Sequence, residues 1–263
     1  MESSRQSASG IEGLIEEGEA LRRLSADPDR AAPVPSARRT HTFYTGISAA
    51  FVVVAFAAFA PTYYLRPLSD APPLSPLLHV HGAVFTAWLL LLFAQSALVA
   101  SHRVALHRRL GIAGALLAGI MVPLGIITAI GAAQRGAARG GLDPVVFLIF
   151  PLGQVVLFAV FLGIALVQRR RPETHRRFVI VATTCLMAPA IARLPLIGER
   201  PILSLGLSAL FVVAGMVHDW KTLGRPHRVY VIGALVLLVS GPVRFGLGHT
   251  AAWQSLARAL VGN

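Results

Sequence analysis

Long apolar runs, separated by short polar segments, fill most of the chain after residue 42. Their length of about 20 residues is what an α-helix needs to cross about 30 Å of hydrocarbon. We therefore predict an all-α, polytopic membrane bundle of seven transmembrane helices. The predicted spans are Phe43–Ala60, Pro76–Ala100, Leu110–Ala133, Pro144–Gln168, Phe178–Leu196, Pro201–His218 and Val229–Leu247.

The two ends of the chain differ from this central region. Residues 1–40 are polar, lack the apolar core of a secretory signal, and are predicted to be disordered, with a short amphipathic helix at Ile11–Leu24. The transmembrane domain is predicted to cover residues 41–249. A tail of residues 250–263 follows, and it contains an amphipathic piece at Trp253–Leu260.

Prolines predict where several spans begin, end or bend. Pro76, Pro144 and Pro201 stand at span starts, where a helix tolerates the missing N–H donor. Pro61 is predicted to end the first span. Four more prolines lie inside spans, where each can kink a helix. These are Pro123, Pro151, Pro189 and Pro242.

The charge of the chain fits a membrane protein better than a nucleic-acid-binding one. The formal net charge is +12, but the Arg residues fall mainly between apolar runs and do not form a basic face with stacking aromatics. With a cytoplasmic N-terminus, the inner segments carry about twice as many basic residues as the outer ones, as the positive-inside rule requires. We predict a multi-pass protein of the bacterial inner membrane, in contact with lipid and without nucleic-acid partners.

Several kinds of chemistry are absent from the sequence. The single cysteine, Cys185, cannot form a disulfide, a zinc cluster or an iron–sulfur site within one chain. No Gly-rich nucleotide fingerprint is present. In the predicted spans there is no carboxylate, so neither a carboxylate pair nor a Ser/His/Asp set is expected at depth.

The nine histidines are the main chemical clue, and three of them lie on the predicted outer side. His79 and His81 are two residues apart, which turns a helix by about 200°, so only one of them can face the bundle. His81 begins a stripe with a spacing of seven that continues through Trp88, Gln95 and His102. Because an amide in lipid usually turns inward, this stripe predicts that His81 faces other helices. The alternative is an interfacial histidine, with Gln95 joining two helices.

Two arginines near the outer side are candidate partners of an anion. Arg193 lies in the fifth predicted span and Arg244 in the seventh, and charged residues within spans normally serve a site or a pair. They can face backbone carbonyls or a ligand such as a haem propionate, a quinone oxygen, a lipid phosphate or a small carboxylate. The alternative is that both snorkel to headgroups.

The remaining histidines suggest a second site on the inner side. His107, His175 and His227 each precede an arginine at a span start, which is typical of headgroup anchoring. The alternative is an axial ligand to haem b, with the arginines holding the propionates. His81 is the outer ligand candidate, with His249 as an exposed partner. An inner haem would use His107 with His175 or His218.

Half of the chain resembles predicted bacterial multi-span membrane proteins of unknown function. The matching stretches include HVHGAVFTAWLLLLFAQSALV, RVALHRRLG and ETHRRFVIVATTCLMAPAIARL. The resemblance implies a membrane fold and no particular activity. A looser likeness is to di-haem transmembrane cytochromes of the b type, although the inner histidines here stand at span ends.

These observations lead to one leading hypothesis and two alternatives. The leading one is a redox or cofactor-binding membrane protein with His81 and His107 as metal ligands, and with His175, His249, Arg193, Arg244, Trp88 and Gln95 in its cofactor sites. The alternatives are a transporter of small molecules or lipids, and a structural membrane subunit. Small residues spaced by four at Gly111, Ala115 and Gly119 predict close helix packing, which also suits a homo-oligomer.

Overall fold

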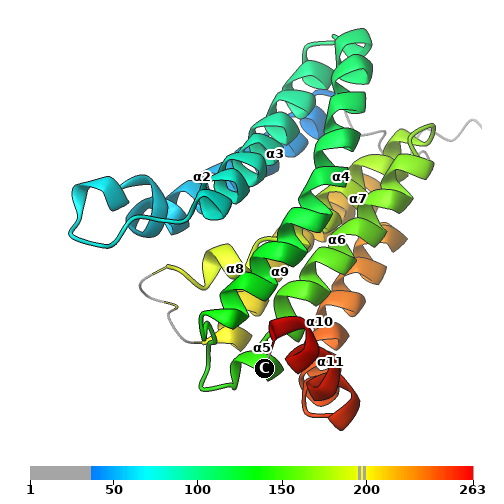
Figure 1. Cartoon of the computed structure of the whole chain (residues 1–263). Helices are drawn as coiled ribbons and strands as arrows, with labels where there is room; N and C mark the ends of the chain where they lie inside the picture. Colours follow the sequence, from blue (N-terminus) through cyan, green and yellow to red (C-terminus); the bar gives the residue numbers. More distant parts are fainter. Residues whose placement is uncertain (1–36, 195–196, 198–199, 263) are drawn as a thin grey trace, which may run out of the picture.

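The computed structural model describes residues 37–194, 197 and 200–262, and it is all-α over these ranges (Figure 1). Within them, six helices are long and apolar enough to cross a membrane, which confirms a multi-span membrane protein. The helices that provide these spans are α2 (Ala37–Phe59) with η1 (Ala60–Tyr64), α3 (Pro76–Ala100), α4 (Val104–Gln134), α5 (Pro144–Phe147) with α6 (Ile149–Val167), α9 (Pro201–Leu223) and α10 (Arg228–Gly248).

The helix limits agree with the predicted spans for α3 and differ elsewhere. The prediction that Pro61 ends the first span is wrong, because the helix continues through it as the single π-helical turn η1. The sixth predicted span ended at His218, whereas α9 runs on to Leu223 and ends at Gly224, which has a φ of 71°. The predicted tail helix Ile11–Leu24 lies outside the described residues.

The fifth predicted span, Phe178–Leu196, is not one continuous helix. It consists of α7 (Pro172–Cys185) and the short α8 (Ala188–Ile191), and Leu196 lies outside the described residues. Pro189 explains the break, since its ring conflicts with the carbonyl four residues earlier, which is that of Cys185. Pro151 has the same relation to Phe147, where α5 ends.

The core lies where α6, α7, α9 and α10 meet. Phe158, Val181, Val212 and Leu237 contribute almost fully buried side chains from these four helices. On one side, α2 and α3 form a hairpin, and Figure 1 shows its η1 end leaning away from α6 and α10. α2 and α3 pack along each other and share a hydrogen bond between the hydroxyls of Ser48 and Ser96, at 2.9 Å.

The end of the chain is an amphipathic helix, α11 (Ala251–Val261), packed across the bundle end beside α5. The indole nitrogen of Trp253 donates to the carbonyl of Val145 at 2.9 Å. The side-chain amide of Gln134 in α4 donates to the carbonyl of Val261 at 3.2 Å. These bonds dock α11 on the ends of α4 and α5.

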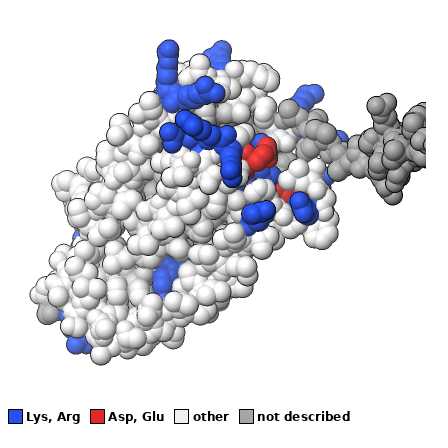
Figure 2. Space-filling model, turned by 90° about the vertical axis from the view of Figure 1, so that its right-hand side faces the viewer, with Lys and Arg blue, Asp and Glu red and all other residues white. Residues whose placement is uncertain are grey.

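Lys and Arg side chains gather mainly at one end of the molecule (Figure 2). The turns from α3 to α4, α6 to α7 and α9 to α10 lie at this end, which we call the basic end. Its exposed cations include Arg38, Arg39, Arg103, Arg108, Arg109, Arg169, Arg170, Arg171, Lys221, Arg225 and Arg228.

Candidate functional site

The first candidate site surrounds His81, about one and a half turns into α3. The imidazole is partly buried and stacks on Phe85, with ring centroids 4.2 Å apart. Its Nδ1 atom is buried and has no hydrogen-bond partner among the described residues. The next residue, Gly82, lets η1 pack closely on α3, because a Cβ there would lie 2.7 Å from Cζ of Tyr63.

Arg193 approaches His81 from the other side, just after α8. Its guanidinium lies 4.7 Å from the centre of the Phe59 ring and is within electrostatic range of His81. Among the described residues it makes one hydrogen bond, to the carbonyl of Pro189. Arg139 from the α4–α5 loop donates to the carbonyl of Ala192 at 3.3 Å, so a second cation stands beside this turn.

His81 and Arg193, with the rings of Phe59 and Phe85, form what we call the His81–Arg193 site. Among the described residues, the charge that acts on His81 is the positive charge of Arg193. Glu199, six residues after Arg193 in the chain, lies outside the described residues. The site thus offers an imidazole nitrogen, guanidinium N–H donors and flat apolar walls, which together suit an oxygen acceptor carried on an apolar molecule.

The stripe predicted along α3 is present as far as Gln95. Trp88 is buried, and its indole N–H lies 3.3 Å from the hydroxyl oxygen of Thr183 in α7. The Oε1 atom of Gln95 is buried without a partner, and its amide faces Gly111 of α4. His102 is not part of the stripe, because it is an exposed turn residue with a φ of 59°.

Arg244 and His249 take no part in the His81–Arg193 site. All three nitrogens of the Arg244 guanidinium donate within the protein, to the Ser240 carbonyl, the Ser240 hydroxyl and the Phe150 carbonyl, at 2.9 to 3.0 Å. Arg244 therefore binds backbone carbonyls, which is one of the possibilities that the sequence left open. His249 is exposed at the end of α10, far from the start of α3 in Figure 1, and its Nδ1 contacts the Phe245 carbonyl at 2.8 Å.

A second pair of histidines lies at the basic end. His107 of α4 and His175 of α7 are within electrostatic range of each other. His175 Nδ1 lies 2.8 Å from the carbonyl of Ala165, and the His107 ring lies close to the main chain of Gln95. Among the described residues, the buried Nδ1 of His107 has no hydrogen-bond partner. The third candidate, His218, stacks on Phe43 at 4.1 Å.

The sequence reasoning missed a buried ion pair near these histidines. The prediction that no carboxylate lies within a span is wrong, because α9 extends past His218 and carries Asp219 with no exposed surface. Its partner is Arg177 of α7, which is 1% exposed. The sequence does contain a sign of this pair, because Asp219 is a single acidic residue directly after an apolar run. It was overlooked because the sixth predicted span ended one residue earlier, at His218.

Comparisons with protein-family models, with curated proteins and with solved structures gave no match. Within the described part of the chain, no group of three or more His, Cys, Asp or Glu side chains is placed to hold a metal ion.

Proposed function

We propose that this integral membrane protein is a redox protein that binds a lipid-soluble quinone at the His81–Arg193 site. The observation that carries the proposal is the buried Nδ1 of His81. Among the described residues it has no hydrogen-bond partner, and the nearby cation Arg193 makes one hydrogen bond. Buried polar atoms are nearly always hydrogen-bonded, so an unpaired one indicates a missing partner.

A quinone meets each requirement of this setting. Its carbonyl oxygens accept hydrogen bonds from imidazole and guanidinium groups, and its ring packs on aromatic side chains such as Phe59 and Phe85. A positive charge beside a quinone carbonyl also stabilises the reduced quinone, whose oxygens carry more negative charge. The polar groups fix the ring, while an isoprenoid tail remains in lipid.

Binding of decylubiquinone to the detergent-purified protein tests this proposal. His81→Phe keeps the stacking surface but removes the hydrogen bond, and Arg193→Met removes the charge. Each is expected to weaken binding about tenfold or more, since hydrogen bonds to charged groups contribute about 1.5–3 kcal/mol. His79→Phe is the matched control, because His79 is exposed on the opposite face of α3. Equal loss in all three variants, or no binding by the wild type, would contradict the proposal.

The second candidate function is electron transfer through a haem b ligated by His107 and His175. It is favoured by the ring contacts of these residues, because metal-ligating histidines usually donate their other ring nitrogen to a carbonyl. The pair fits the donor set of a haem with two axial histidines, and the arginines of the basic end suit its propionates. When bound, the haem would supply one-electron chemistry.

An absorption spectrum of protein from haem-replete cells, oxidised and then reduced with dithionite, tests this candidate. A Soret band at near-stoichiometric haem that is lost in His107→Ala and His175→Ala, but kept in His249→Ala, would support it. A spectrum with protein absorbance alone would exclude it. A protein that binds neither quinone nor haem would direct attention to the transport hypothesis.

For the membrane orientation, we propose seven crossings, with α7 and α8 together forming a broken fifth one. α7 begins at the basic end, where α6 finishes, and Figure 1 shows α8 well away from that end. The excess of Arg at the basic end supports a cytoplasmic location for it in a bacterial inner membrane. The His81–Arg193 site then lies in the outer half.

A further inference from the structure

A groove runs between α2 and α3 at the basic end, remote from the His81–Arg193 site. It encloses about 670 Å³ and is lined by residues of both helices and of the turn after α3. The lining residues are Arg38, His41, Thr42, Thr45, Gly46, Ala49, Phe93, Ala100 and His102. None of them is acidic. Arg38, His41 and His102 lie at the basic end, where the start of α2 is close to the end of α3.

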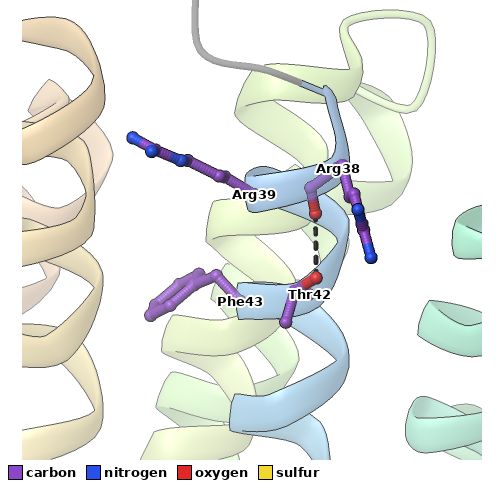
Figure 3. Close-up of a pocket in the computed structure, with 4 residues that line it drawn as sticks. All are labelled: Arg38, Arg39, Thr42 and Phe43. Atoms are coloured by element: carbon purple, nitrogen blue, oxygen red, sulfur yellow. Dashed lines mark hydrogen bonds between the residues drawn. The ribbon is translucent and has the colours of Figure 1, made fainter.

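The mouth of the groove brings together three basic side chains. The rings of His41 and His102 meet edge to face with centroids 6.0 Å apart. In Figure 3, Arg38 points from the first turn of α2 toward the side away from Arg39 and Phe43. The hydroxyl of Thr42 is already engaged, because it donates to the carbonyl of Arg38 at 2.9 Å. Arg38 and the two histidines are therefore the groups available to an anion.

His102 holds its position at a conformational cost. Its φ of 59° is left-handed, a conformation that glycine adopts freely and that other residues adopt rarely. His102 is exposed in this turn. Glycine would suit this backbone conformation best, but only histidine supplies an imidazole ring to the mouth of the groove.

Below the mouth, the groove is apolar and open. A Cβ added to Gly46 would meet no atom within 4 Å, and Phe93 is 38% exposed beside it. Thr45 adds a buried hydroxyl oxygen that has no hydrogen-bond partner in the described part of the chain. A cationic mouth above an apolar channel matches a phosphate attached to an acyl chain.

We propose that this groove is a binding site for one anionic phospholipid. The side chains of Arg38, His41 and His102 bind its phosphate, and an acyl chain lies along Gly46, Ala49 and Phe93 between the two helices. A free phosphate ion would use the mouth but leave the apolar floor empty. Charge complementarity and the apolar floor therefore both favour a lipid.

Native mass spectrometry of the delipidated, detergent-solubilised protein with added phosphatidylglycerol tests the site. Arg38→Gln is expected to weaken binding about fivefold, the effect of about 1 kcal/mol for one cation near a lipid phosphate. His102→Gly removes the ring while relaxing the backbone, so it should weaken binding without lowering the melting temperature. Gly46→Leu fills the floor at a position where an added Cβ would meet no atom within 4 Å, and it should abolish binding. Arg170→Gln, an exposed cation outside the groove, is the control and should bind as the wild type does.

The alternatives give different results in the same experiment. Equal binding of phosphatidylcholine and phosphatidylglycerol would overturn recognition of a net negative lipid. Displacement of bound lipid by inorganic phosphate alone would assign the mouth to free phosphate. Unchanged binding in both His102→Gly and Gly46→Leu would remove the groove as the binding site.

Discussion

The guanidinium of Arg177 in α7 donates two hydrogen bonds to the carboxylate of Asp219 in α9, from Nε to Oδ2 at 2.8 Å and from Nη2 to Oδ1 at 2.5 Å. Arg177 also donates to the carbonyl of Glu173, and the main-chain N–H of His227 donates to Asp219 at 3.2 Å. One buried pair thus ties α7, α9 and the start of α10 together.

This pair predicts a large loss of stability when one partner is removed. Arg177→Met leaves the buried carboxylate of Asp219 without its counter-charge, which costs about 3–5 kcal/mol in the free energy of unfolding. Asp219→Asn should cost less, because Arg177 keeps its ion pair with Glu173 at 2.7 Å. The double variant Arg177→Met/Asp219→Asn should lose much less than the sum of the two single losses. Melting temperatures in detergent measure this, with Arg171→Gln as an exposed control. Additive single and double losses would show that the two groups are not coupled.

The contact between Arg244 and α6 depends on a glycine. A Cβ at Gly153 would overlap the Arg244 side chain, which passes over it to reach the Phe150 carbonyl. We expect Gly153→Ala to destabilise the protein by about 1–3 kcal/mol through overpacking. Gly163→Ala in the same helix meets no atom within 4 Å and should be neutral, or stabilising by about 0.5–1 kcal/mol. A similar melting temperature for both variants would contradict the assigned role of Gly153.

His227 predicts a pH dependence of stability. Its Nδ1 accepts from the N–H of Val229 and caps α10, and burial together with the nearby charge of Arg177 lowers the pKa of the imidazole. Because the folded pKa lies below the unfolded value, the contribution of His227 is present above about pH 6.5 and is lost as pH falls through the folded pKa. Protonation also removes the capping acceptor.

The melting temperature should therefore fall between pH 7 and 5 in the wild type, as melting curves at a series of pH values can show. His227→Asn keeps an acceptor at the cap without titrating in this range, so part of the pH dependence should disappear. His227→Ala removes the cap at every pH and should cost about 0.5–2 kcal/mol. An identical pH profile in wild type and His227→Asn would exclude this histidine as the titrating group.

The proposal that α7 and α8 form a broken fifth crossing predicts the sidedness of the loops. In a Cys185→Ser background, single cysteines are introduced at the exposed positions Ala71, Arg170, Arg225 and Ser255. If α7 and α8 together cross the membrane, Arg170→Cys and Arg225→Cys react with an impermeant maleimide from the same side, and Ala71→Cys and Ser255→Cys from the opposite side. Labelling of Arg170→Cys and Arg225→Cys from opposite sides would show that α7 and α8 form a re-entrant segment.

The class of the protein and most of its helices could be predicted from the order of its residues. Uncharged runs of membrane length force helix formation, because a lipid-exposed backbone must satisfy its own hydrogen bonds. This physical constraint is local, so the limits of α3 could be predicted from Pro76 and Ala100. The spacing of His81, Trp88 and Gln95 likewise predicted which face of α3 turns toward its neighbours.

Which polar side chains contact one another could be seen only in the tertiary structure. From the sequence, Arg193 and Arg244 were equal candidates to bind an anion. In the structure, the N–H donors of Arg244 bind Ser240 and Phe150, whereas Arg193 lies near His81. Arg177 and Asp219 are 42 residues apart and gave no sign of their pairing. Such contacts depend on helix rotation and on the break before Pro189, which are set by the packing of all helices together and not by the pattern of any one of them.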